Sequence, residues 1–268
     1  MLNLGIKKMD CKKEKQTIYV ASCSFGKDSI ATILLALENK EPIDMVVFAE
    51  VMFDNEKNIS GEIPEHINWI YNVAIPKLNE MGLKVDIVRS EKDYVSLCRK
   101  VLTKGKNKGK MYGIQNSFPC YANSELKIKP IKKYFNSFKG EYNIIQYIGI
   151  ACDEPNRLKR LEGTNKVSLL DKYGYTEKMA MDLCRKYNLL SPLYEMGERG
   201  GCFFCYNANI KRYMHIFKNY PSYWKALKDL YHETKSKSFK YNKTIEDIEQ
   251  EIRDIEYANT IQLKLFEI

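Results

Sequence analysis

The stretch from residue 17 to residue 49 constrains the fold of this chain more than any other. Residues 17–21 are a short run of β-favouring side chains, and the hexapeptide Ser-Phe-Gly-Lys-Asp-Ser follows at 24–29. Residues 30–37 have the wide apolar face of a buried helix, and residues 44–49 are typical of a buried strand. A strand, a loop, a helix and a second strand in this order form the repeating unit of a parallel sheet that carries helices on its faces.

Further elements extend the same pattern. The sequence predicts a helix over 64–81 that Gly82 stops, strands over 85–88 and 144–150, and a helix that starts at the N-cap Thr176. A capping box begins at Thr244 and leads into isoleucines at helical spacing. We therefore expect an α/β fold: a Rossmann-like, mostly parallel sheet flanked by helices, with a helical C-terminal extension.

The hexapeptide has the features of an anion-binding loop. Gly26 permits a tight turn and a close approach of backbone N–H groups, and the positive end of the following helix points to the same place. Ser24 and Ser29 add hydroxyl donors, and Lys27 adds a cation. The loop is not a Walker A motif, because only one glycine precedes the lysine. The alternative is an ordinary glycine turn, but its position after the first strand favours phosphate binding.

The cysteines indicate a metal site. We expect a cytoplasmic protein without a membrane span, since no long apolar run and no secretory signal is present. Cysteines in such a protein are more often ligands, catalytic groups or free thiols than disulfides. Cys202 and Cys205 form a C-x-x-C turn that can hold one metal ion or one edge of a cluster. A redox dithiol and buried apolar thiols are the alternatives, and we expect Cys23, Cys98 and Cys184 to be core residues.

Five short segments in collinear order resemble one family. These segments are Ser24–Ser29, residues 48–54, residues 61–65, Cys120 with the Leu-Lys-Ile-Lys-Pro run at 126–130, and the Gly-Ile-Ala-Cys-Asp-Glu-Pro-Asn-Arg run at 149–157. Over residues 17–210 they resemble the PP-loop adenine nucleotide α-hydrolases, and within these the phosphoadenosine phosphosulfate reductase family. Phage-encoded members and the DNA phosphorothioation sulfurtransferases are the nearest branches of this resemblance.

The resemblance implies a role for individual residues. Ser24, Phe25, Gly26, Lys27, Asp28 and Ser29 would hold the phosphates of ATP or a related adenine nucleotide. Asp54 would lie at the tip of the second strand, near the ribose or Mg²⁺. Lys27, Lys127 and Arg157 would meet the phosphate or the activated substrate. Cys120 would be the first choice to join Cys202 and Cys205, and Cys152 the second, although the family pattern more usually has alanine there.

The expected function follows from the same resemblance. The chain would adenylylate a substrate with release of pyrophosphate, and a cluster or metal at the thiolates would assist sulfur transfer. Three thiolates suit a [4Fe–4S] cluster with one open iron, and four suit zinc or a fully ligated cluster. The rivals are a thiol-dependent sulfonucleotide reductase, which the lack of any cysteine after Cys205 disfavours, and a non-catalytic nucleotide-binding module with structural zinc.

Charge and aromatic content leave the partner open. A net charge of +9 suits a polyanion but also simple solubility. The basic loop 99–110 is the better candidate for a nucleic-acid substrate or for a lid, and a sulfur-donor protein or a homodimer are further candidates. The stripe that includes Tyr220, Tyr223 and Trp224 is expected to pack in a core. We divide the chain into a polar leader (1–16), a nucleotide-binding domain (17–210) with a cysteine knuckle near 200–206, and a helical extension (211–268).

Overall fold

The centre of the molecule is a sheet of five parallel strands. The computed structural model describes residues 15–266, so the expected leader, with Cys11, lies almost entirely outside the described residues. The strands in spatial order are β5 (Val85–Arg89), β2 (Met45–Glu50), β1 (Gln16–Cys23), β6 (Tyr142–Ile148) and β7 (Lys166–Val167). All four neighbouring pairs are parallel. The expected Rossmann-like α/β class is therefore confirmed.

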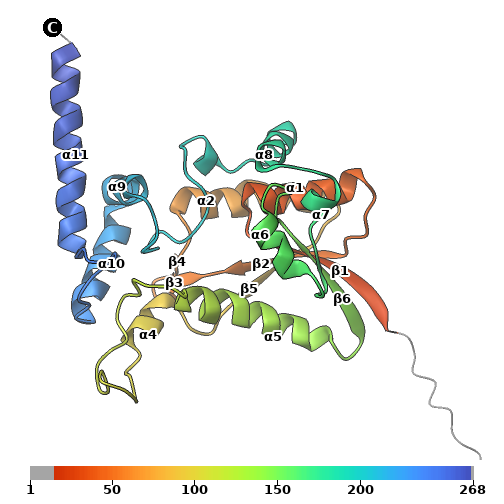
Figure 1. Cartoon of the computed structure of the whole chain (residues 1–268), viewed down its shortest axis with the longest axis horizontal. Coiled ribbons are helices and arrows are strands. Elements are labelled where there is room, and N and C mark those ends of the chain that lie inside the picture. Colours follow the sequence, from red (N-terminus) through yellow and green to blue (C-terminus); the bar gives the residue numbers. More distant parts are fainter. Residues whose placement is uncertain (1–14, 267–268) are drawn as a thin grey trace, which may run out of the picture.

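Helices cover both faces of the sheet (Figure 1). On one face, the apolar side chains of α1 pack with those of α2, α3, α7 and α8 in one core. On the other face, α5 packs through Phe135 on Ile18, Val20 and Val47. The helices of this part of the chain are α1 (Lys27–Glu38), α2 (Pro64–Trp69), α3 (Ile75–Glu80), α4 (Tyr94–Arg99), α5 (Lys129–Phe138), α6 (Pro155–Leu158), α7 (Leu169–Lys172) and α8 (Glu177–Lys186).

The helix predicted over 64–81 forms, but a π-helical turn interrupts it. Residues Ile70–Ala74 are π-helical, and Pro76 follows at the start of α3. The same arrangement recurs at Asn123–Ile128, directly before Pro130 in α5. Proline has no N–H to donate and its ring crowds the carbonyl four residues earlier, so a widened turn lets the helix continue past it. Gly82 ends the first of these helices with φ 83°, as expected.

The C-terminal helices share a second core with the middle of the chain. Trp224, Leu227 and Ile248 are buried together with Phe53 and Tyr94, and Tyr220 and Tyr223 pack against them. The tyrosine stripe is thus a packing surface, as predicted. The elements are β3 (Met52–Asp54), β4 (Ile59–Ser60), α9 (Ile210–Asn219), α10 (Pro221–Glu233) and α11 (Ile245–Phe266). No described helix combines the length and the apolarity needed to cross a bilayer.

The order of the strands reverses at β1. The chain runs outward from β1 through β2 to β5, and then returns to place β6 on the other side of β1. In open parallel sheets, ligands bind beyond the carboxyl ends of the strands at such a reversal. Gly149, directly after β6, lies against the first turn of α1: a Cβ there would be 2.6 Å from Asp28 C and 2.6 Å from Ser29 N. The fold therefore needs a residue without a side chain at this position.

This contact predicts a large difference between two glycine substitutions. Gly149→Ala should destabilise the protein by about 1–3 kcal/mol, the usual cost of overpacking, because backbone atoms cannot move aside. Gly140→Ala is the matched control, since nothing lies within 4 Å of a Cβ at Gly140. Urea unfolding measures both free energies. Equal stabilities of the two variants would contradict the contact.

Candidate active site

The hexapeptide 24–29 is held rigidly at the carboxyl end of β1. Gly26 is the N-cap of α1, and Phe25 has φ 58°, in the left-handed region. The Phe25 side chain is fully buried and packs edge-on against Phe48 and Trp69, with ring centroids 5.1 and 6.4 Å away. The side chain of Phe25 thus anchors the loop in the core, and only the backbone of Phe25 is left to contact a ligand.

The hydroxyls of Ser24 and Ser29, both expected to be donors to a phosphate, differ in their contacts. The Ser29 hydroxyl donates to Gly26 O at 2.9 Å and accepts from Ser24 N at 3.3 Å, so it stabilises the loop itself. The Ser24 side chain is exposed. Within residues 15–266, the amides of Gly26 and Asp28 have no hydrogen-bond acceptor. These amides at the start of α1 are free to bind an anion.

Lys27 is the charged centre of the loop and is only 8% exposed. Its ammonium lies 2.8 Å from Asp28 Oδ1 and 3.3 Å from Glu177 Oε2. Burial opposes the charge of Lys27, but these two carboxylates outweigh burial and raise the pKa of Lys27. The backbone amide of Lys27 donates to the Tyr194 hydroxyl at 3.0 Å. The Tyr194 oxygen is therefore the acceptor for this amide at the start of α1.

The carboxylates beside Lys27 outnumber it. Burial is the main cause that raises the pKa of Asp28; Lys27 opposes this, and the charges of Glu177 and Glu154 add to it. Glu154 also accepts two bonds from Arg157, at 2.5 and 2.7 Å. The guanidinium of Arg157 is thus engaged with Glu154 on the surface. A polyphosphate would therefore need a divalent cation to meet these carboxylates.

The C-x-x-C turn is pinned to the segment that follows β4. Cys205 N donates to Cys202 O at 3.2 Å, and Phe203 N donates to Gly61 O at 2.8 Å. Cys202 also forms an isolated antiparallel bridge with Glu62. A Cβ at Gly61 would come within 2.8 Å of Val51 O and 3.0 Å of Phe204. The glycine thus lets the turn approach the end of β2, which brings the cysteines to the same edge of the sheet as the hexapeptide 24–29.

Three of the four predicted thiol ligands share one cavity. Cys120, Cys202 and Cys205 line a cavity of about 200 Å³, together with Glu62 and Lys127. Burial raises the pKa of the Cys202 thiol well above its usual value, with smaller contributions from Glu62 and Cys205 that Lys127 opposes. Among the described residues, no three His, Cys, Asp or Glu side chains converge at metal-ligand spacing. The thiols suit a soft metal by type and place, but they would have to rotate or draw together to bind it.

Cys152 is in a different place. It follows β6, where its N–H donates to Tyr175 O at 3.0 Å, and it is not among the residues that line the thiol cavity. Asp54 also differs from its expected position. The second strand ends at Glu50, and Asp54 belongs to β3, where its carboxylate accepts from Lys57 N at 3.0 Å. The expected location at the tip of the second strand is wrong for Asp54, because the chain leaves the sheet four residues earlier.

A cleft lies beside the C-x-x-C turn. It has a volume of about 620 Å³, and its lining includes Cys205 and Tyr194, whose hydroxyl accepts from Lys27 N. Gly201 and Cys205 line both this cleft and the thiol cavity. Arg199 is exposed along the cleft, and Arg212 is held there by a buried pair with Glu198 at 3.1 Å. The cleft is thus open to solvent, and it adjoins the thiol cavity through Gly201 and Cys205.

Lys127 and His66 lie between the hexapeptide 24–29 and the thiols. Lys127 contributes electrostatically to the pKa of Cys23, of His66 and of Cys202, and it forms no ion pair with any described residue. His66 is fully buried, with Nδ1 2.9 Å from Ser191 Oγ and Nε2 3.4 Å from Ser24 O. His66 has no partner at ligand spacing in the sequence, and its place beside the loop could be found only from the fold.

Sequence reasoning missed three other residues. Tyr194 and Glu177 reach Lys27 from segments far along the chain, and no local motif marks either one. Glu62 belongs to the segment 61–65 that resembles the family, but the sequence predicted no role for it. In the structure it lines the thiol cavity. Its burial, with 5% of its surface exposed, is the signal that a sequence cannot provide.

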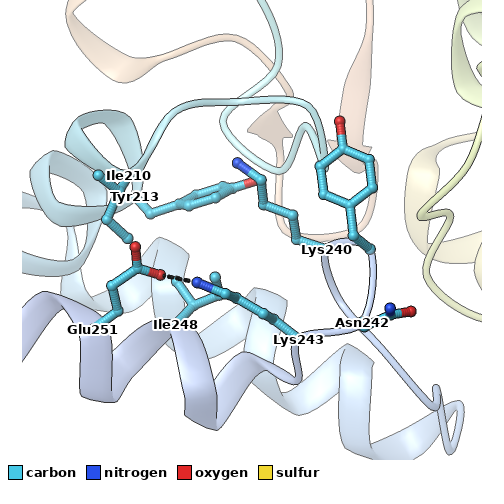
Figure 2. Close-up of a pocket in the computed structure, with 8 residues that line it drawn as sticks. Ile210, Tyr213, Lys240, Asn242, Lys243, Ile248 and Glu251 are labelled. Atoms are coloured by element: carbon cyan, nitrogen blue, oxygen red, sulfur yellow. Dashed lines mark hydrogen bonds and ion pairs between the residues drawn. The ribbon is translucent and has the colours of Figure 1, made fainter.

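The C-terminal helices brace the cysteine turn from behind. The Tyr213 hydroxyl donates to Cys205 O at 2.5 Å, and the Lys240 ammonium donates to Ala208 O. Figure 2 shows Lys240 beside the Tyr213 ring, and Lys243 paired with Glu251, around a cavity of about 340 Å³. Burial lowers the pKa of Lys240. The segment 205–208 is thus fixed by α9 and by the loop before α11.

Comparison with known proteins adds little to this geometry. No family model and no solved structure matches the chain. A curated relative, the uncharacterized nin region protein ORF290 of Escherichia phage lambda, is 27% identical over 103 residues. The match covers 38% of this chain and 34% of that protein, so it spans about a third of the relative's length.

Burial of His66 predicts a pH dependence of stability. Burial is the main cause that lowers the pKa of His66 below 6.5, so the unfolded chain binds this proton before the folded protein does. Stability should therefore fall as the pH drops below 6.5, by up to about 1.4 kcal/mol per pH unit, until the folded pKa is reached. Urea unfolding between about pH 7 and about pH 5.5 measures this slope. His66→Gln should flatten it, and an unchanged slope in that variant would refute the assignment.

Proposed function

We propose that the chain binds ATP or a related adenine nucleotide at residues 24–29 and catalyses attack at its α-phosphate. The observation that carries the proposal is that one cleft is lined both by Tyr194, whose hydroxyl accepts from the amide of Lys27, and by Cys205. The position of the loop at the strand-order reversal supports it further. The resemblance of five collinear segments to the phosphoadenosine phosphosulfate reductase family supports an adenine nucleotide as the ligand.

The roles follow from the contacts. The free amides of Gly26 and Asp28, at the positive end of α1, would bind the phosphate oxygens, which would displace the Tyr194 hydroxyl from Lys27 N. Mg²⁺ would be held by the triphosphate and by a carboxylate beside Lys27, because oxygen ligands are those it prefers. Lys27 and the amides would then stabilise the charge that develops on the α-phosphate.

The bond changes are those of adenylylation. A substrate oxygen attacks the α-phosphorus, the bond to the bridging oxygen breaks, and pyrophosphate leaves with that electron pair. A sulfur or nitrogen nucleophile then displaces AMP from the activated carbon. Lys127, between the loop and the thiol cavity, is the side chain best placed to bind the activated intermediate. Arg157 would have to leave Glu154 to take part.

Cys120, Cys202 and Cys205 would hold a metal ion or an iron–sulfur cluster in the thiol cavity. Such a group would supply a site that binds or carries sulfur close to the activated substrate. The chain's own contribution is the position of the thiols. Tyr213 and Lys240 hold the turn and the residues directly after it through hydrogen bonds to the backbone. Burial raises the pKa of the Cys202 thiol most, Glu62 adds to this and Lys127 opposes it.

Lys27→Ala tests the nucleotide site. The substitution removes the buried ammonium of the loop, so pyrophosphate release from ATP with Mg²⁺ should fall by about a hundred-fold or more, the usual cost of losing one group that stabilises a transition state. The matched control is Lys40→Ala, which removes an exposed lysine just after α1 and should leave the rate unchanged. Coupled detection of pyrophosphate measures both. The proposal fails if the wild type releases none or if both variants match it.

Cys202→Ser tests the thiol site. Anaerobically purified wild type should contain about one metal ion or cluster per chain, with a broad absorbance near ~400 nm if it holds iron and sulfur or stoichiometric zinc if it is colourless. The serine variant should lose the metal, while Cys152→Ser, outside the cavity, should keep it. Elemental analysis with the ultraviolet–visible spectrum gives the answer. Loss of metal in both variants would make Cys152 a ligand and overturn the three-thiol assignment.

A further inference from the structure

The segment between α4 and α5 has an unusual balance of charge. Residues 94–124 contain Arg99 and the five lysines 100, 104, 106, 108 and 110, and no Asp or Glu. Figure 1 shows this segment projecting from the body of the molecule beside α4. All five lysines are exposed, and none forms an ion pair with a described residue. The charge is therefore available to a partner.

The lysines are carried on a defined hairpin, which we call the lysine hairpin (residues 100–112). Leu102 N donates to Lys110 O at 2.9 Å, Tyr112 N donates to Lys100 O at 2.8 Å, and Val101 bridges Met111. The tip, residues 104–110, consists only of lysine, glycine and asparagine. Because the ladder fixes the base, the cations are presented on one short projection and not spread over the surface.

Aromatic rings stand at the base of the hairpin. The rings of Tyr112 and Tyr121 lie 5.1 Å apart, and the Lys100 ammonium lies 5.8 Å from the centre of the Tyr121 ring. Phe118, in the next turn, is 84% exposed. Gln115 holds that turn: its side chain donates to Ser117 O at 2.7 Å and accepts from Tyr121 N at 2.6 Å. An exposed ring on a braced turn beside a cationic hairpin is the arrangement that proteins use to stack unpaired bases and contact the backbone.

The same segment reaches the thiol cavity. Tyr94, Gln115 and Cys120 line that cavity, and Tyr121 follows Cys120 directly. A strand that lies along the hairpin and stacks on the rings would therefore end at the mouth of the cavity. A lipid surface fits less well, because the tip has no apolar side chain to insert. An acidic protein would use the lysines but would have no need of the exposed ring.

We propose that the lysine hairpin, with Tyr112, Tyr121 and Phe118, is a binding surface for single-stranded nucleic acid. The surface binds the phosphates through the lysines and the bases through the rings. Binding itself requires neither ATP nor a metal, so it stands apart from the proposed function. The single claim that rests on that function is that the bound strand is the acceptor of the transferred group.

Fluorescence anisotropy with a labelled oligothymidylate of about 20 nucleotides, longer than the about 4–16 nucleotides that one single-strand-binding module covers, tests the surface directly. Between about 50 and 200 mM salt, each phosphate contact contributes about 0.7 to the slope of log K against log salt. Lys104→Gln/Lys106→Gln/Lys108→Gln should therefore reduce the slope by about 2. The matched control, Lys40→Gln/Lys139→Gln/Lys159→Gln, removes the same charge from exposed lysines elsewhere and should leave the slope unchanged.

Phe118→Leu separates stacking from charge. Loss of one stacked base should weaken binding about five-fold or more without changing the salt slope. Lys27→Ala should bind the oligonucleotide as the wild type does, so failure of the nucleotide site and failure of this surface are told apart. The proposal is overturned if the control triple variant loses as much slope as the hairpin variant, if Phe118→Leu binds normally, or if polyglutamate or anionic vesicles compete as well as unlabelled oligonucleotide.

Discussion

The close approach of Gly149 to the first turn of α1 is the contact on which the site depends. It allows β6 to lie beside β1 while the loop after β6 passes directly against the backbone of Asp28 and Ser29. The first turn of α1 is thereby fixed between Phe25, buried beneath it, and Gly149, packed against it. Fixed amides bind an anion better than mobile ones, because no ordering is needed when the ligand arrives.

A second close approach places the thiols. Gly61 lets the Cys202–Cys205 turn pack against the end of β2. Tyr213 and Lys240 hold the same turn and the residues directly after it through hydrogen bonds to the backbone. The two glycines thus act at two points of one edge of the sheet. The cleft is lined by Tyr194, whose hydroxyl contacts the first turn of α1, and by Cys205 of the C-x-x-C turn.

The sequence predicted the fold well because its signals are local. Apolar runs of strand length, the Thr176 N-cap and the Thr244 capping box each act over a few residues, and each forms as expected. The π-helical turns before Pro76 and Pro130 were not predicted, because the pattern of apolar residues is nearly the same for an α-helix that contains proline. The position of Asp54 was wrong because strand ends depend on pairing partners, which a single segment does not encode.

The site was predicted only in part, for the same reason. The loop residues and the C-x-x-C turn are contiguous in sequence, so the motifs name them; their roles in binding stay predictions. Glu177, Tyr194 and His66 reach the loop from distant segments, and nothing in their neighbours marks them. Cys120 and Cys152 both belong to segments that resemble the family, but only Cys120, the first choice, lines the cavity with Cys202 and Cys205. Proximity in sequence to a motif therefore did not decide which thiols meet.

The central claim is that the amides at the start of α1 bind the phosphates of an adenine nucleotide. Two-dimensional amide NMR of the isotope-labelled protein, titrated with ATP and Mg²⁺, tests it residue by residue. The account predicts that the amide signals of Gly26, Lys27 and Asp28 shift most and saturate together, and that inorganic pyrophosphate shifts the same signals. Unchanged signals for these three residues at saturating ATP, or shifts confined to the Tyr213–Lys240 cavity, would contradict it.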